Sequence, residues 1–230
     1  MAEKYLALSP YNYGFNNPIN VYDPDGRDGE LIKDGNNLII RVTLNYSLES
    51  LNRYNLERNK GTYTQEDFQN DFNNYYSSRN GEYDIEGQTY NINFEIVFNV
   101  VNEDKDMPSA DKLDGTSNLN FDANLNKGGT HIDNVITLGG NPRHEAGSGD
   151  TGGSFSHEVI HLLGVPDTGE NESSKLSSWS LTRQLQRDEV STMLSPAIKF
   201  ANQNNITRGS ILITHSRPNG GRFEPKLLKR

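Results

Sequence analysis

A short stretch in the second half of the chain contains the residue types of a metal site. Residues 156–167 read SHEVIHLLGVPD, in which two histidines stand four residues apart and a glutamate follows the first. On a helix, residues four apart project from one face, so His157 and His161 can aim their imidazoles at one point. Zinc accepts such nitrogen ligands at roughly 2.0–2.1 Å. Glu158 would then flank the ion, where it could take a proton from a water molecule.

Asp167 is the candidate third ligand, and it can serve only if the helix ends before it. It lies ten residues after His157 (167 − 157), which in an unbroken helix is a rise of about 15 Å. Gly164 stands where a left-handed helix end costs least, and Pro166 disfavours a return to helix. The sequence therefore contains the chain reversal that the ligand set His157, His161 and Asp167 requires.

Other interpretations of this stretch stay open. A buried amphipathic helix with a glycine cap would use the apolar residues at 159, 160, 162 and 163 as its core face. That burial alone does not explain two histidines and a glutamate within one turn. Glu172 is a rival third ligand, because NESSK (171–175) resembles the downstream glutamate motif of thermolysin-like peptidases. It follows closely in a loop rich in Gly, Ser and Glu, whereas that glutamate normally lies on a second helix.

The remaining histidines are isolated. His131 and His215 are single residues on expected strands, and His144 stands beside Glu145 in a glycine-rich loop. No serine is convincingly paired with a histidine for nucleophilic catalysis. We therefore interpret these three histidines as structural or exposed residues.

Composition bounds the class of protein. The 230 residues carry 22 Lys and Arg against 31 Asp and Glu, a formal charge of −9, which argues against nucleic acid as the main partner. The chain contains no cysteine, which excludes disulfide scaffolds, zinc ribbons and thiol nucleophiles. No apolar run is long enough for a membrane span, and the first residues have no signal-peptide core. If the protein is exported, another segment must direct the export.

The elements that would position the motif can be read from periodicity. The alternating runs 37–47, 90–102, 131–140 and 209–216 are expected strands, with 90–102 central in the sheet. Residues 62–79 are an expected helix with Thr64 and Asp67 as a capping box and an aromatic core stripe. The motif helix follows a loop at 141–153, and further helix or turn is expected at 179–190, then helix at 196–205.

Polar and turn-rich stretches are expected to be irregular. Residues 103–130 are expected to form a long surface loop, and the basic tail at 226–230 a frayed end. Residues 1–29, dense in Pro, Gly, Asn and Tyr, are an expected leader, so that 30–230 is one folded domain. The order of elements predicts an α+β fold, an α/β sandwich in which a mixed sheet lies over the motif helix.

HEVIHLLGVPD resembles the HExxHxxGxxD zinc signature of metzincin metallopeptidases, in the variant with aspartate as third ligand. The resemblance implies zinc held by the two histidines and Asp167, with Glu158 as catalytic base. That family has a methionine-containing turn beneath the metal, and STMLSP supplies Met193 at a later position in the chain. Met193 would be a structural floor rather than a ligand. Some members add a tyrosine ligand after this methionine, which Leu194 and its successors do not provide.

The leader YNYGFNNPINVYDPDGRDG resembles the end of the RHS-repeat-associated core of bacterial polymorphic toxins. In that family the segment closes a large shell, and a variable toxin domain follows. Self-cleavage near this junction involves aspartates of the DPxG type. We transfer no such role to Asp23 or Asp25, because only a fragment of the shell is present.

The sequence thus predicts a zinc endopeptidase that acts as the C-terminal toxin domain of a secreted Rhs-type effector delivered to a target cell. Its partners would be a protein or peptide substrate aligned on an edge strand near 131–138, a cognate immunity protein, and the parent RHS shell with its secretion machinery. The alternative is a non-enzymatic binding module in which zinc stabilises the fold. Structural zinc usually has four protein ligands, whereas three are identified here.

Overall fold

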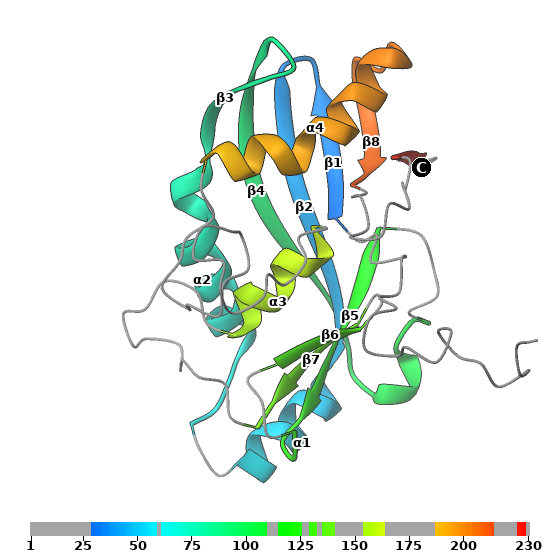
Figure 1. Ribbon diagram of the computed structural model, residues 1–230. Coiled ribbons are helices and arrows are strands. Elements are labelled where there is room, and N and C mark those ends of the chain that lie inside the picture. The colour runs from blue at the N-terminus through cyan, green and yellow to red at the C-terminus, as the bar shows by residue number, and fades with distance from the viewer. Residues whose placement is uncertain are drawn as a thin grey trace, which may run out of the picture.

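The computed structural model has an α+β fold in which helices pack on a mixed sheet (Figure 1). It describes residues 29–58, 61–109, 115–125, 129–132, 135–140, 154–163, 187–213 and 225–228. Residues 1–28 of the expected leader therefore lie outside the described residues. Its last residue, Gly29, is not leader but the first residue of strand β1.

One sheet contains all the strands of the described residues. They are β1 (Gly29–Asp34), β2 (Asn37–Ser47), β3 (Gly81–Ile85), β4 (Gln88–Val101), β5 (Thr116–Asp122), β6 (Gly129–Ile132), β7 (Val135–Gly139), β8 (Arg208–Leu212) and β9 (Lys226–Leu228). Strand β2 has the bounds that alternation predicted, and β4 is an inner strand as expected.

Strand β2 is the centre of the sheet. On one side it pairs in parallel with β4, which in turn pairs with β3 in an antiparallel hairpin. On its other side it pairs first with β1 and then, through residues 43–45, in parallel with β5. The sheet continues from β1 to β8 and β9, and from β5 to β7 and β6. The strand before the motif helix, β7, therefore lies one strand from the edge.

The helices of the described residues are α1 (Leu48–Arg58), α2 (Gln65–Tyr76), α3 (Ser154–Leu162) and α4 (Arg187–Gln203), with short 3-10 turns η3 (Ser77–Arg79) and η4 (Asp104–Asp106). Helix α2 begins with the predicted capping box: the Thr64 side chain accepts from the Asp67 N–H, and the Asp67 carboxylate accepts from the Thr64 N–H at 2.7 Å. Reciprocal caps satisfy donors that the first helical turn leaves unpaired. The capping box and the aromatic stripe of α2 are confirmed.

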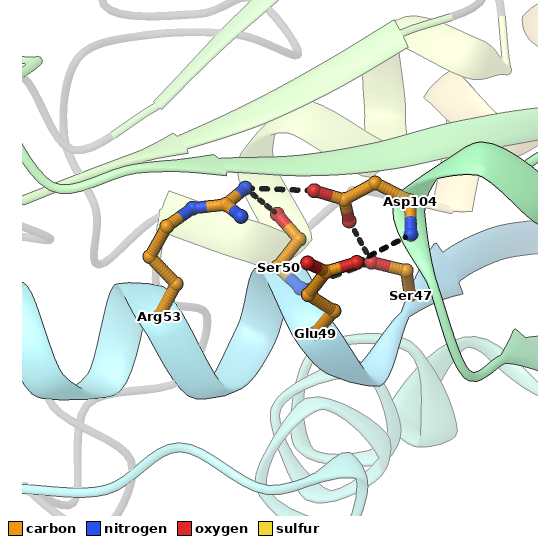
Figure 2. Close-up of polar contacts among 5 residues, drawn as sticks. All are labelled: Ser47, Glu49, Ser50, Arg53 and Asp104. Atoms are coloured by element: carbon orange, nitrogen blue, oxygen red, sulfur yellow. Dashed lines mark hydrogen bonds and ion pairs between the residues drawn. The ribbon is translucent and has the colours of Figure 1, made fainter.

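The start of α1 is held by a polar network that ties it to η4, the turn that follows β4 (Figure 2). The Ser47 hydroxyl accepts from the Ser50 N–H at 3.0 Å and donates to Asp104. Asp104 also receives the Arg53 guanidinium at 2.9 Å, and its own N–H donates to Glu49 at 2.9 Å. Hydrogen bonds from Ser47 and Arg53 lower the pKa of Asp104, so its charged form is favoured. The network sets where α1 leaves the sheet.

The core lies between the helices and one face of the sheet. Along β2, alternate side chains from Leu38 to Tyr46 are at most 1% exposed and face the helices. In Figure 1, α3 and α4 cross this same face. A dense aromatic cluster, formed by Tyr46, Tyr54, Tyr63, Phe68, Phe98, Phe121 and Phe155, joins β2, β4, β5, α1, α2 and α3.

The expected surface loop at 103–130 is wrong in its second half, which contains the inner strand β5 and begins β6. Strand β5 has a polar sequence, TSNLNFD, yet Ser117 is fully buried. The Asn45 amide offsets part of this burial, because it donates to the Thr116 hydroxyl, the Ser117 carbonyl and the Asn118 side chain at 3.1–3.2 Å. The Ser117 hydroxyl itself is buried without a hydrogen-bond partner among the described residues. Polar groups can be buried when they are hydrogen-bonded, so hydropathy alone misses this strand.

Two other expectations are corrected. Residues 131–140 do not form one strand: β6 and β7 are the antiparallel limbs of a hairpin, and the edge strand is β6. The C-terminal tail is not frayed throughout, because residues 226–228 form β9 against β8. In both cases strand pairing, which short sequence windows do not display, decides the structure.

Phe68 is one of two rings, with Phe98, through which the aromatic cluster contacts Phe155 of the motif helix. Replacing it with alanine leaves a cavity among Tyr63, Phe98, Phe121 and Phe155, so we expect the free energy of unfolding to fall by about 3–5 kcal/mol. Urea denaturation measures this. Leu56→Ala is the matched control, because Leu56 is 82% exposed and its loss should change stability by less than about 0.5 kcal/mol. If both variants lost the same free energy of unfolding, Phe68 would not be a core residue.

Candidate functional site

The candidate site is carried by helix α3, which runs from Ser154 to Leu162 with Leu163 in a turn. Its first turn is fixed by two contacts. The Phe155 ring packs on Phe68, with ring centroids 5.1 Å apart, and the Tyr76 hydroxyl donates to the Ser156 carbonyl at 3.2 Å. Complete burial raises the pKa of Tyr76, which keeps the hydroxyl protonated as a donor. These contacts place the residue before His157.

The apolar side of α3 is fully buried, as the amphipathic interpretation expects. Val159, Ile160 and Leu162 are 0% exposed, and so is Leu163 beyond the helix. His157 and His161 are only partly buried, so they lie toward the less covered side. Burial of one side is compatible with a metal site on the other. It fixes the rotation of the helix about its axis, so that the two histidines face the less covered side.

The two imidazoles are placed as ligands of one ion would be. Their ring centroids are 5.0 Å apart and their planes are nearly perpendicular, at 89°. Imidazoles that bind one zinc ion tetrahedrally through nitrogens at roughly 2.0–2.1 Å have centroids about 5 Å apart. The spacing of these two imidazoles is therefore compatible with a shared zinc ion.

Glu158 is almost buried, at 7% exposed, between the two histidines in sequence. A carboxylate is seldom buried without a specific environment, because removing its charge from water is costly. In this position most bulk water is excluded from the carboxylate.

The helix ends where the third-ligand hypothesis requires. The Leu163 N–H bonds the Ile160 carbonyl at 3.1 Å, an i to i−3 contact that tightens the last turn. Beneath this end, a Cβ atom on Gly29 would stand 3.2 Å from the Leu162 carbonyl oxygen and 2.7 Å from a Leu163 methyl group. The start of β1 therefore packs closely against the end of α3.

The remaining predicted ligands lie beyond the described residues. These are Asp167 and its rival Glu172, with Gly164, Pro166, His144, Glu145 and His215. Within the described ranges, no group of three or more His, Cys, Asp or Glu is arranged to hold a metal ion. His131 belongs to β6, where its backbone pairs with Ile136. The structure thus brings together His157, Glu158 and His161, and the third ligand stays a prediction.

Met193 is not in a turn, which corrects the expectation for STMLSP. Residues 187–203 are one helix, α4, that includes Met193 and Pro196. Pro196 removes one backbone donor, so the Thr192 carbonyl loses its usual helical partner. The helix continues because Val190, Leu194 and Ile198 on its inner face are 0% exposed. Met193 is 8% exposed in the same apolar core as α3, which is a packing position.

Two neighbours of the site could not be identified from the sequence alone. Helix α3 packs against both strands of the β6–β7 hairpin, so the edge strand β6 runs beside it. Tyr76 looked only like a core aromatic, but its hydroxyl also holds the first turn of α3. Helical spacing predicted that Tyr76 is inside, whereas its partner 80 residues away depends on tertiary structure.

Comparisons with known proteins add no identification. No family model matches the chain, and neither the curated proteins nor the solved structures contain a match. Across the described residues, no helix combines the length and apolar character that a membrane crossing needs.

Asp71, on the helix that supports α3, should make stability depend on pH. Burial, and then the Asp67 charge, raise the pKa of Asp71 from 3.8 to about 6. The raised value means that the folded state binds more protons, so the free energy of unfolding should fall as pH rises from about 4 to about 6. Asp71→Asn removes this loss and should stabilise the protein by about 1 kcal/mol at pH 7, after allowance for solvent screening.

Thermal unfolding of both proteins across this pH range measures the difference. The variant and the parent should have similar stability well below pH 4, where the carboxyl is neutral in both the folded and the unfolded chain. A constant difference at every pH would show that Asp71 acts through packing instead of through its charge.

Proposed function

We propose that this protein is a zinc-dependent endopeptidase. The observation that carries the proposal is the pair of perpendicular imidazoles, His157 and His161, 5.0 Å apart and one helical turn from each other, with the nearly buried Glu158 between them in sequence. Asp167 completes the proposed ligand set, which leaves a fourth position open for substrate and water. An open position separates a catalytic zinc site from a structural one.

The roles of the residues follow from their chemistry. Zinc, when bound, would polarise the scissile carbonyl group and lower the pKa of the water that attacks it. The Glu158 carboxylate takes the proton from that water and returns it to the leaving amine. The two histidines and Asp167 hold the ligand geometry, and the buried side of α3 keeps the histidines from rotating away.

The edge strand β6 supports a peptide as the substrate. It is the outermost described strand on its side of the sheet, and it runs beside α3. An extended peptide can add to such an edge through main-chain hydrogen bonds, which would align its backbone across the candidate site. This moves the proposed alignment surface from 131–138 to the outer side of 129–132.

We also propose that the domain is the toxin part of a secreted Rhs-type effector. The support is the resemblance of residues 11–29 to the closing segment of an RHS core. Such a toxin would require an immunity protein in the producing cell, and an inhibitor that covers α3 and β6 is the simplest form. The alternative is a binding module in which zinc only stabilises the fold. It does not explain why a glutamate follows the first histidine.

Glu158→Ala separates these two functions. If Glu158 is the general base, the variant should retain bound zinc and the folded state but cleave peptide at least about a hundredfold more slowly. Zinc content by mass spectrometry, circular dichroism and peptide turnover together measure this. In intoxicated cells, mapping of new protein termini with this variant as control would identify the substrates. Undiminished toxicity of the variant would refute the peptidase mechanism.

The third ligand is tested by two variants in parallel. Asp167→Ala should weaken zinc binding by more than about a hundredfold, because loss of a direct ligand exceeds the 10–100-fold cost of losing a supporting hydrogen bond. Glu172→Ala should leave the affinity unchanged. Competition with a chromogenic chelator measures both. If Glu172→Ala weakened zinc binding and Asp167→Ala did not, Glu172 would be the third ligand and the resemblance to the metzincin signature would not hold.

A further inference from the structure

Arg58 is a buried cation that lacks a counter-charge among the described residues. Arg58 is the last residue of helix α1, and it is 8% exposed. Its Nε and Nη1 atoms are buried and have no hydrogen-bond partner. None of the ion pairs between described residues includes it. Charged groups that are nearly removed from water are ordinarily paired, so this guanidinium is unusual.

The surroundings of Arg58 hold it in place without neutralising it. The guanidinium carbon lies 4.5 Å from the centre of the Tyr63 ring and 5.0 Å from that of Tyr54. Asn55 fixes Tyr63, since its side chain both accepts from the Tyr63 N–H and donates to the Tyr63 carbonyl. Ring faces attract a cation, and the end of a helix adds a weak favourable field. Both interactions orient the guanidinium but leave the Nε and Nη1 donors without a hydrogen-bond partner among the described residues.

Arg58 is connected to the structures that form the proposed peptidase site. The Tyr54 hydroxyl donates to the carbonyl of Gly139, the last residue of β7, at 2.7 Å. On the other side, Tyr63 stacks on Phe68, and Phe68 packs on Phe155 of α3. Arg58 therefore stands at the Gly139 end of the β6–β7 hairpin, whose outer edge is the proposed path of the substrate.

We propose that Arg58 anchors a subsite for a carboxylate group of the peptide substrate. The planar guanidinium matches a carboxylate with two parallel hydrogen bonds, and pairing is strong where water is mostly excluded. A peptide can present this group as an acidic side chain or as its C-terminus. The inference rests on the proposed peptidase function, and it adds a preference for substrates that carry negative charge.

The test uses quenched fluorescent decapeptides in matched pairs. One series carries a single Glu at successive positions, and its partner series carries Gln there. The zinc-loaded protein should cleave one Glu peptide with a kcat/KM about tenfold above its Gln partner. Arg58→Met, which removes the charge but keeps an apolar side chain, should bring that ratio close to one. Arg53→Met is the control, because Arg53 is a half-exposed arginine on the same helix and the ratio should survive its loss.

A second comparison separates the two sources of the carboxylate. The Gln series is prepared with a free C-terminal acid and with a C-terminal amide. If the acid-to-amide ratio depends on Arg58 while the Glu-to-Gln ratio does not, the subsite binds the peptide terminus. Dependence of the Glu-to-Gln ratio alone assigns it to an acidic side chain.

Three results would overturn the proposal. The first is equal cleavage by the unmodified protein within every Glu/Gln pair and within every acid/amide pair. The second is a preference that Arg58→Met retains. The third is an equal loss of cleavage on both members of the pairs, which would make Arg58 a residue of the fold only. If Arg58→Met does not fold, Arg58→Lys replaces it and should reduce the ratio, because an ammonium group lacks the planar fork.

Failure of the peptidase proposal would look different. In that case no peptide of any series is cleaved by the zinc-loaded protein. The subsite is then measured through binding of the Glu and Gln peptides to the Glu158→Ala protein by fluorescence anisotropy. Tighter binding of one Glu peptide that disappears with Arg58→Met supports the subsite without any turnover, and equal binding of all pairs refutes it.

Discussion

The candidate site depends on how the first turn of α3 is packed. Phe155 inserts its ring against Phe68 and Phe98, and Tyr76 donates to the adjacent Ser156 carbonyl. Ring packing sets the position of the helix and the hydrogen bond restricts its rotation, because the Ser156 carbonyl can meet the hydroxyl from only a narrow range of directions. With those freedoms removed, the direction of His157 and His161 follows from helical geometry.

The same packing explains how a helix of nine residues can have both a buried apolar side and a polar side that carries the histidines. One side of α3 is buried completely, and the other carries two partly covered imidazoles. Glu158 stands near the boundary, almost removed from water. A carboxylate there interacts strongly with a neighbouring cation, because little solvent screens the charge. The packing of α3 that stabilises the fold therefore also removes Glu158 from water, which a general base at this position would need.

The sheet contributes in a less visible way. Its inner strand β5 is polar, and Asn45 of β2 satisfies three of its groups. These hydrogen bonds join β5 to β2, and β7 and then β6 follow β5 toward the edge of the sheet. The edge strand β6 contacts α3. At the end of that hairpin, Tyr54 links Gly139 to the ring stack beneath Arg58. The aromatic cluster thus connects the Gly139 end of the hairpin with helix α3, through Tyr54, Phe121, Phe68 and Phe155.

The sequence by itself determined the local features. Alternation predicted β2 with its observed bounds, the Thr64 capping box predicted α2, and the spacing of His157 and His161 predicted one shared face. Each rests on contacts within a few residues, which a single chain segment displays. Only the tertiary structure decided that TSNLNFD is an inner strand, that 131–140 is a hairpin with β6 outermost, that Met193 lies in a helix, and that Arg58 is buried on two rings. Those outcomes depend on partners far away in sequence, such as Asn45 for Ser117 and Gly139 for Tyr54, and no local pattern names such partners.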